Sequence, residues 1–191
     1  ADFKALDNPE DYILKKGGKI LVALYENEPV GVCALIKMND ENYDFEMAKM
    51  AVSPKAQGKS IGWLLGQAIA ETAKKLGASK FLYVSAMGAD VTSSIFYNKV
   101  KGETEEDLKA FQFDYLGLFR PSLLLGNRHE FRFGEQVATV FMKPLVWLKV
   151  AKNLRPIYDY QVAKAMVKTA LSHHSSPVEI ILSGQMQDLS K

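Results

Sequence analysis

Two groups of residues have the side chains and the spacing to do chemistry, and each follows an expected strand. The first is a glycine-containing turn, residues 57–62, that leads into a helix. The second combines Ser85 with Tyr97 and Lys101, and the last two are spaced i and i+4, one helical turn apart. A turn of the first kind suits a phosphate, whereas the second set suits proton transfer.

The stretch of residues 50–62, which ends in this turn, is the sharper of the two motifs. Backbone N–H groups at a helix start have no partner inside the helix and lie at the positive end of its dipole, so they attract anions. Small residues let a pyrophosphate approach the backbone. We therefore expect a phosphate site, although the pattern also fits a helix start without a ligand. The expected binding residues are Val52, Gln57, Gly58, Lys59, Ser60, Ile61 and Gly62.

The second set, Ser85, Tyr97 and Lys101, is a catalytic candidate. An ammonium close to a phenol favours proton transfer from the phenol near neutral pH. Ser85 would stand at the end of a strand, face the same crevice and hydrogen-bond a carbonyl oxygen. The three residues are equally compatible with a scaffold that does no chemistry.

The first motif resembles the cofactor-binding segment of the GNAT N-acetyltransferase superfamily, whose pattern is Gln/Arg-x-x-Gly-x-Gly/Ala. Gln57 and Gly62 match that pattern, whereas Ser60 stands where its first glycine belongs. The resemblance covers residues 10–84 or so and implies that the turn binds the pyrophosphate of acetyl-CoA. It also implies that strand 47–52 offers backbone groups to the pantetheine arm, and that Tyr97 acts as general acid to the leaving thiolate.

The second motif resembles atypical or extended short-chain dehydrogenase/reductases, through residues 84–90, 95–103 and 119–126. That resemblance spans residues 81–191 or so. It implies catalytic roles for Ser85, Tyr97 and Lys101 and makes NAD(P) the alternative cofactor. The first half of that family, which carries its dinucleotide loop, is not in this chain. The sequence therefore looks like a chimera, natural or engineered.

Three functions follow from these resemblances. The first is an acetyl-CoA-binding protein of the GNAT type, with N-acetyl transfer as its candidate reaction. The second is an NAD(P)-binding reductase-like protein, and the third is a recombined fold that catalyses nothing. The first is favoured because only its phosphate-binding loop is present in the chain, so an acyltransferase is preferred to an oxidoreductase.

Hydrophobic periodicity predicts an α/β fold with a mixed, three-layer sheet. An antiparallel hairpin begins the sheet, and strands alternating with helices predict Rossmann-like parallel strands after it. The expected strands are 19–25, 30–38, 45–52, 80–85, 115–120 and 178–182, and the expected helices are 61–76, 92–110, 134–144 and 158–172. Thr92 or Ser93 would cap the second helix.

We expect one composite domain over residues 1–191, with a GNAT-like segment, 1–84, and a segment like a Rossmann C-terminal half, 85–191. Strand 45–52 would lie beside strand 80–85 in the sheet. The phosphate turn, Ser85 and Tyr97 would then share one crevice at the carboxyl ends of the strands.

Composition limits the partners. The net charge of +2 over 191 residues is too small to suggest nucleic acid or an anionic membrane, and no apolar stretch approaches the length of a membrane span. We therefore expect a small-molecule substrate or cofactor, with a homodimer as an open alternative. The single cysteine, Cys33, lies in an apolar run and should be a buried thiol, which fits a reduced cytoplasm.

Several other side chains are expected to be structural. No metal site is expected, because His129, His173 and His174 lack metal-ligand spacing. The histidine pair and the acidic run at 103–107 should lie on the surface. Most residues of the aromatic series between Phe111 and Trp147 should be core, although Phe131, Phe133 and Trp147 could line a pocket or a dimer patch.

Overall fold

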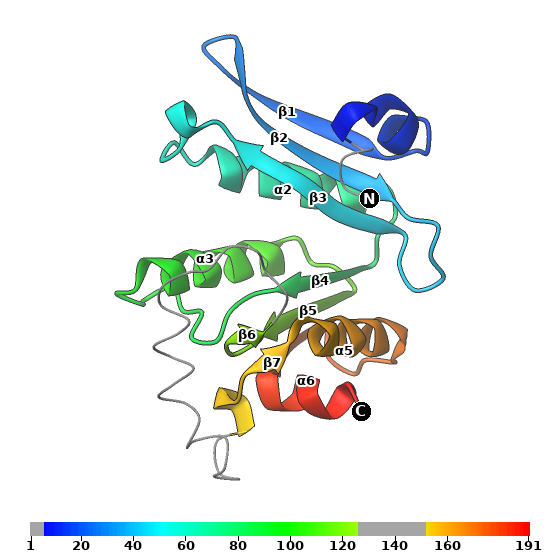
Figure 1. Cartoon of the computed structure of the whole chain (residues 1–191), viewed down its shortest axis with the longest axis vertical. Coiled ribbons are helices and arrows are strands. Elements are labelled where there is room, and N and C mark those ends of the chain that lie inside the picture. Colours follow the sequence, from blue (N-terminus) through cyan, green and yellow to red (C-terminus); the bar gives the residue numbers. More distant parts are fainter. Residues whose placement is uncertain (1–5, 126–151) are drawn as a thin grey trace. The chain divides into compact units, whose positions relative to one another are not determined.

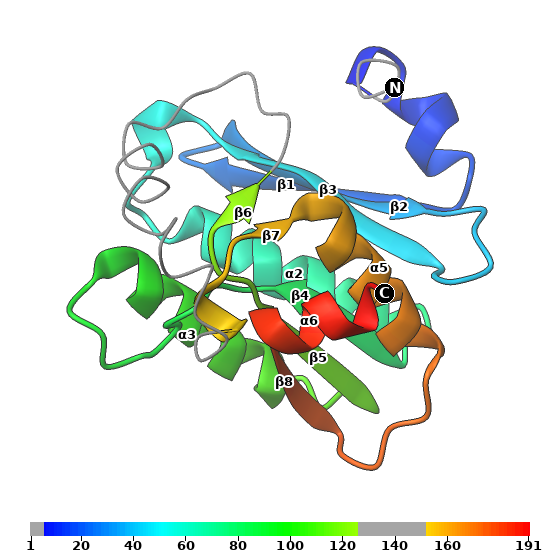
Figure 2. The same cartoon turned by 60° about the horizontal axis from the view of Figure 1, so that its bottom comes forward.

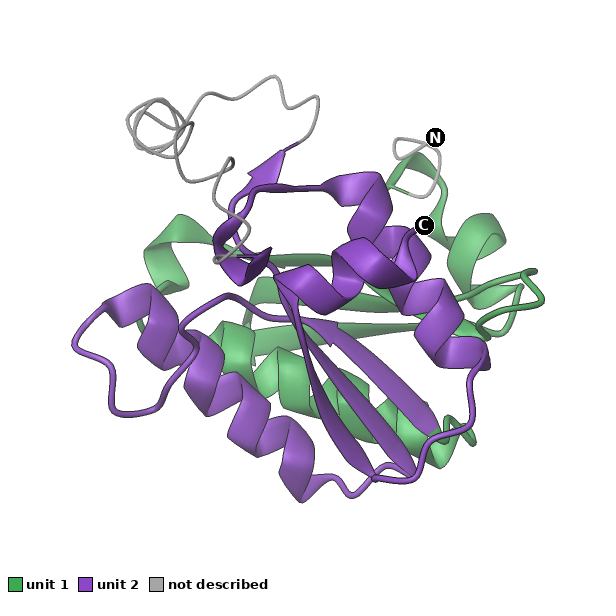
Figure 3. Cartoon of the chain, turned by 90° about the horizontal axis from the view of Figure 1, so that it is seen from below, with its two compact units in different colours: residues 1–79 green, residues 80–191 purple. Residues whose placement is uncertain are grey.

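The computed structural model describes residues 6–125 and 152–191, and the chain divides into two compact units, 1–79 and 80–191 (Figures 1 and 3). Each unit is described by itself. Several predictions fall outside the described residues: helix 134–144 and the roles of His129, Phe131, Phe133 and Trp147. None of the described helices is both long and apolar enough to cross a membrane.

The first unit is an antiparallel sheet with one long helix against it (Figure 1). Its strands follow the order β1-β2-β3, so β2 is central. The elements are η1 (Glu10–Leu14), β1 (Lys19–Tyr25), β2 (Glu28–Lys37), β3 (Phe45–Val52), η2 (Pro54–Ala56) and α2 (Ile61–Lys75).

The core of the first unit joins β2 to α2. Cys33 and Leu35 of β2 pack in one buried cluster with the apolar stripe of α2, which comprises Ile61, Leu65, Ile69 and Ala73. Gly31 allows the closest approach: a Cβ atom there would lie 3.0 Å from the Leu65 side chain and 3.2 Å from that of Ile61. The first turn of α2 therefore rests directly on β2.

The second unit is built around a parallel sheet, β4-β5-β8, with a small separate pair, β6-β7. Helices α5 and α6 lie side by side (Figure 2). The elements are β4 (Lys80–Val84), α3 (Phe96–Ala110), β5 (Tyr115–Arg120), β6 (Leu124–Leu125), η4 (Lys152–Leu154), β7 (Ile157–Tyr158), α5 (Asp159–Leu171), β8 (Val178–Leu182) and α6 (Ser183–Leu189).

Helices cover both faces of the parallel sheet (Figure 3). Phe119 packs in a buried cluster with Val162 of α5 and Met186 of α6. The next residue, Arg120, points to the other face, because side chains alternate along a strand, and there it pairs with Glu105 of α3. The described residues therefore confirm the α/β class, with an antiparallel hairpin followed by parallel strands.

Two expectations about the sheet differ from the structure. The described strands form three sheets rather than one, and strand 45–52 is not beside strand 80–85. β3 pairs with β2, while β4 pairs with β5. Because β4 pairs within the second unit, the two units divide before Lys80. Whether the chain forms one composite domain with segments 1–84 and 85–191 stays a prediction.

The start of α3 also differs from the prediction. Thr92 and Ser93 were expected to cap the helix, but α3 begins at Phe96. The Thr92 hydroxyl and backbone N–H instead donate to the Asp90 carboxylate, and these hydrogen bonds lower the pKa of that carboxyl. The capping residue types thus form a turn in the loop before the helix.

The acidic run on α3 was expected to be solvated, but Glu105 is buried. Its side chain is 1% exposed and accepts two hydrogen bonds from Arg120, at 2.9 Å to Nε and 2.5 Å to Nη2. The bond to Glu105 is the main cause that raises the pKa of the Arg120 guanidinium. A paired, bidentate arrangement is the form in which a buried charge is tolerated.

Replacing Glu105 with alanine should destabilise the protein by about 3 kcal/mol, because Arg120 would keep a partly buried charge without its partner. Glu103→Ala is the matched control, since Glu103 pairs with Lys99 on the exposed side of the same helix and should contribute less than about 0.5 kcal/mol. Urea denaturation followed by far-UV circular dichroism measures both. Equal losses for the two variants would contradict the structural role of the buried pair.

Candidate functional site

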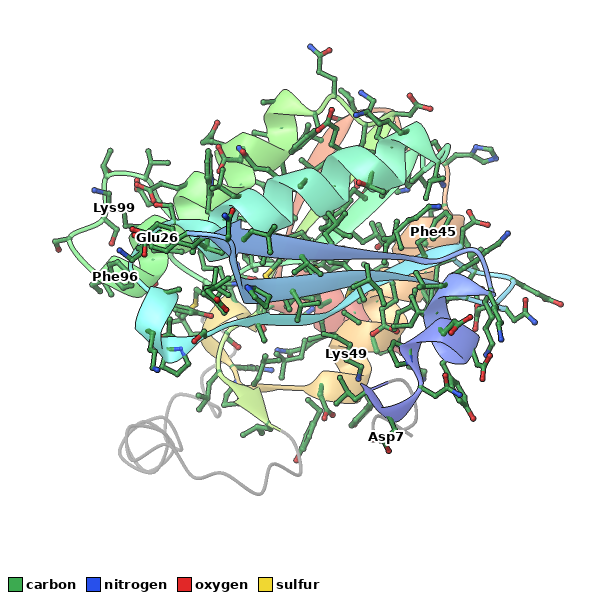
Figure 4. The ribbon with its side chains drawn as sticks, turned by 90° about the horizontal axis from the view of Figure 1, so that it is seen from above. Asp7, Glu26, Phe45, Lys49, Phe96 and Lys99 are labelled. Atoms are coloured by element: carbon green, nitrogen blue, oxygen red, sulfur yellow. The ribbon has the colours of Figure 1, made fainter. Side chains whose placement is uncertain are left out.

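The strand that precedes the phosphate turn, β3, contains a β-bulge. Val32 pairs with Ala51 and Ala34 pairs with Ala48, so Lys49 and Met50 together stand opposite a single residue of β2. Lys49 has a φ of +53°, which fits the sharp bend of a bulge. Figure 4 labels Lys49 within β3 and Phe45 at the start of the strand. A bulge interrupts the hydrogen-bond ladder and leaves backbone groups available beside a ligand.

The turn after β3 is open to solvent. Gly58 has a φ of +78°, and a Cβ atom added to it would meet nothing within 4 Å. Residues 57–60 are all exposed. The Gln57 amide donates to the Val52 carbonyl at 3.3 Å, which ties the turn back to the end of β3. The space beside Gly58 is therefore open.

Helix α2 starts at this open turn. Its first intrahelical hydrogen bond runs from the Leu64 N–H to the Ser60 carbonyl at 3.0 Å, so the N–H groups of Ile61 and Gly62 precede the helical ladder. No acidic side chain lies in the first turn of α2. A Cβ atom on Gly62 would lie 3.7 Å from Val52, an ordinary contact. The positive end of the helix dipole is thus not neutralised by its own first turn.

Two polar side chains of the turn adopt notable positions. Ser60, the N-cap residue, has a φ of +58° and makes no side-chain capping bond. Lys59 lies over the Tyr25 ring, 4.6 Å from its centroid, and donates to the Tyr25 hydroxyl at 3.3 Å. The predicted cofactor-binding residues therefore form one continuous strand–turn–helix surface within the first unit, with a cation beside it.

The second predicted set lies in the second unit and is only partly assembled. Ser85 follows β4, is 4% exposed, and its hydroxyl has no hydrogen-bond partner among the described residues. The Lys101 ammonium donates to the Tyr83 hydroxyl at 3.0 Å and to the Val84 carbonyl at 3.1 Å. Tyr97 is 55% exposed on the first turn of α3. Lys101 is therefore bound to Tyr83 at the end of β4, and the catalytic roles remain predictions.

Helix α3 is held at this position by close backbone contact. A Cβ atom on Gly102 would lie 2.4 Å from the Asp90 carbonyl carbon, so the loop before α3 touches the helix directly. The Asp90 N–H also donates to the Asn98 carbonyl at 3.1 Å. Contact between loop and helix fixes the segment that carries Tyr97 and Lys101.

Sequence reasoning missed several residues in both units. Tyr83 is the partner of Lys101, and its position next to the end of a strand was the available signal. The bulge at Lys49 has no signature in the sequence. His174 was expected at the surface, but its ring stacks on that of Tyr115, with 3.5 Å between the ring centroids. Its Nδ1 lies 3.4 Å from Oε2 of Glu179. Burial is the main cause that raises the pKa of the Tyr115 phenol, and the neighbouring Glu179 carboxylate raises it further.

The structure agrees with the expectation for the single cysteine. Cys33 is fully buried, and burial raises the pKa of its thiol. No group of three or more metal-ligating side chains occurs within residues 6–125 and 152–191. The shared crevice between the turn, Ser85 and Tyr97 stays a prediction, because the turn belongs to one unit and the other two residues to the other.

Comparisons with known proteins identify the family of this chain. The model of the acetyltransferase (GNAT) family matches residues 2–102, which is more than half of the chain. The protein FMP52 of Meyerozyma guilliermondii is 32% identical over 177 residues, which cover 88% of this chain and 75% of that protein. The chain belongs to the GNAT acetyltransferase family and to the family of the FMP52 proteins. Both matches include residues of the first unit. The GNAT match covers residues 2–102, and the FMP52 match covers too much of the chain to leave out residues 1–79.

Other relatives match more partially. FMP52 of Eremothecium gossypii is 39% identical over 131 residues, 66% of this chain and 58% of that protein. HTATIP2 of Rattus norvegicus is 35% identical over 122 residues, 64% of this chain and 50% of that protein. The chain thus spans between half and three-fifths of these two relatives. A crystal structure of a GNAT acetyltransferase from Staphylococcus aureus is 28% identical, with a TM-score of 0.36, and covers 39% of this chain and 46% of that one.

These relatives correct one expectation and leave another open. A cytoplasmic location is contradicted, because the FMP52 relatives are named as mitochondrial proteins. A reduced, buried thiol such as Cys33 is compatible with both the cytoplasm and mitochondria, so it could not predict the location. The GNAT resemblance is confirmed as family membership, whereas the reductase-like half and the chimeric join near Val84 gain no support and stay predictions.

Replacing Ser60 with glycine should raise stability by about 1 kcal/mol, because the left-handed backbone at Ser60 is strained for a residue with a Cβ and no capping bond is lost. Ser60→Ala is the control, since alanine keeps the strain. Thermal unfolding of both variants tests this. A loss of stability in the glycine variant would mean that the Ser60 hydroxyl supports the turn.

Proposed function

We propose that the chain binds acetyl-CoA, with the cofactor pyrophosphate at Gln57–Gly62, and that its reaction is N-acetyl transfer. Membership of the GNAT family, which generally binds acetyl-CoA, supports the choice of cofactor. The observation that carries the proposal is the succession of a bulged strand, an open glycine turn and a helix start within one unit. The comparisons give no comparable support to NAD(P).

Each part of this surface has a role in the proposed complex. Backbone N–H groups of Ile61 and Gly62 would hold phosphate oxygens, since they lie at the positive end of α2. The bulge in β3 would present backbone groups to the pantetheine arm, which has amides along its length. Lys59, exposed beside the turn, would add a positive charge close to the phosphates. Ser60 leaves less room than glycine but brings a hydroxyl donor.

The proposed reaction moves an acetyl group from sulfur to nitrogen. The amine nitrogen attacks the thioester carbonyl, the carbon–sulfur bond breaks, the nitrogen loses a proton and the thiolate gains one. Tyr97 is our candidate donor of that last proton, because its hydroxyl is exposed on α3 and has no competing hydrogen bond within the described residues. We also propose a mitochondrial location, after the names of the FMP52 relatives.

Coenzyme A binding can be tested at Gly62. Gly62→Asp should abolish binding, because its carboxylate would repel the pyrophosphate, while the same charge in the first turn of α2 favours the helix. Wild-type protein at a hundred times the Kd should gain about 2.7 kcal/mol of stability from coenzyme A. Thermal shift with coenzyme A, and with NAD⁺ as the control ligand, measures this.

Gly62→Asn is the matched control, with the same size and no charge, and it should keep part of the coenzyme A shift. Loss of the shift together with an unchanged or higher melting temperature of the ligand-free Gly62→Asp variant separates lost binding from misfolding. No shift of the wild type with saturating coenzyme A would overturn the proposal and favour the inert fold. A shift with NAD⁺ alone would favour the reductase-like alternative.

Tyr97→Phe should lower kcat for acetyl transfer by about a hundredfold or more, with KM for acetyl-CoA nearly unchanged, because the phenylalanine ring removes only the donated proton. Tyr160→Phe is the control, since Tyr160 is 58% exposed on α5 and should not affect turnover. Release of free coenzyme A thiol in the presence of an amine acceptor measures both. Equal kcat in the two variants would remove Tyr97 from the mechanism.

A further inference from the structure

Within residues 6–125 and 152–191, no strand pairs with the outer edge of β1. The order β1-β2-β3 puts β1 at one side of the sheet, with β2 as its only strand partner among the described residues. An edge strand presents a row of unpaired N–H and C=O groups, and proteins usually blunt it with charges, proline or a bulge. β1 has seven residues, Lys19–Tyr25, and only Lys19 at its start is charged.

Large apolar side chains along β1 are exposed as well. Val22 is 54% exposed, Leu24 66% and Tyr25 39%. The register irregularity near Ala23 adds its extra residue, Val30, to β2, so β1 itself continues without an insertion. A regular, apolar strand with one unpaired edge is the feature to which another strand can add.

The opposite edge of the same sheet differs. β3 carries the bulge at Lys49 and Met50, which breaks its ladder and places a lysine on the strand. A bulge is one of the devices that prevent strand addition. The two edges of the sheet therefore differ in regularity, and of the two described edges β1 is the better suited to pair with another strand.

Charges at the two ends of β1 select the partner. Lys16 and Lys19 lie at its beginning, where Lys15 is already paired with Asp11 and Glu10. Glu26 and Glu28 lie at its end, with Glu26 in the turn to β2 (Figure 4), and Lys59 contacts Tyr25 there. An antiparallel second copy brings each basic end against an acidic end, whereas a parallel copy would bring like charges together.

We propose that β1 pairs antiparallel with β1 of a second copy, across a two-fold axis near Val22, which joins two three-stranded sheets into one. In this register Val22 meets its own counterpart, and Ile20 lies opposite Leu24 of the partner subunit. The apolar side chains that are exposed in one copy become cross-strand neighbours. The interface is isologous and therefore closed, so it gives a dimer rather than a filament.

Sedimentation velocity over a wide concentration range tests this pairing. The wild type should reach twice the monomer mass of 21.3 kDa. Val22→Lys should remain a monomer, because two ammonium groups would meet at the axis. Phe96→Lys is the matched control: Phe96 is 82% exposed at the start of α3, and this variant should remain a dimer.

A charge exchange at the two ends of β1 gives a second, independent test that leaves the apolar residues of the strand unaltered. Lys19→Glu or Glu26→Lys alone should weaken the dimer, because like charges then face each other at both ends, and the double variant should restore it. Far-UV circular dichroism and melting temperature report folding, so the exchange series decides the matter if Val22→Lys does not fold. A wild type that is monomeric at every concentration, or a dimer lost in Phe96→Lys and kept in Val22→Lys, overturns the proposal.

Discussion

Close packing of α2 on Gly31 determines where the phosphate turn can be. Ile61 is at once the first residue of the helix and a member of the core, and its side chain and that of Leu65 reach the backbone of β2 only because Gly31 has no Cβ. The N–H groups at the start of α2 are thus fixed by the core on one side, while the turn before them stays exposed. Packing therefore fixes the helix end of the site, and the hydrogen bond from Gln57 to the Val52 carbonyl ties the turn to β3.

Helix α3 is positioned by a different interaction, a buried ion pair. Glu105 and Arg120 join α3 to β5, and Gly102 lets the loop at Asp90 touch the helix. Lys101 then reaches Tyr83 and the end of β4. The described residues thus give the two units separate means of holding their candidate groups: apolar contact in the first and paired charge in the second.

Periodicity predicted most elements of the fold. Strands 19–25, 45–52, 115–120 and 178–182 match the structure at both ends, because alternation of apolar side chains is a local property. The division into separate sheets could not be predicted, since it depends on which strands hydrogen-bond to each other. Ser183–Leu189 was missed as a helix because seven residues are too few for a clear helical period.

At the candidate sites, the sequence predicted the positions of the residues better than the contacts that they make. The turn at residues 57–62 was found because glycine and a helix start are local features. Burial of Glu105 follows from its spacing with Leu108 on the inner face of α3, yet the acidic neighbours concealed it. The partnership of Lys101 with Tyr83 requires the register of a helix against a strand, which residue types alone do not give.

Burial of Cys33 has a practical consequence. The single thiol of the chain lies in the core between β2 and α2, with no exposed surface. An alkylating reagent can reach it only when the core around it opens, so the rate of modification under native conditions, relative to that of an exposed thiol, reports this opening. The chain thereby contains its own reporter of partial unfolding, and a cysteine introduced elsewhere could be labelled without first removing the native one.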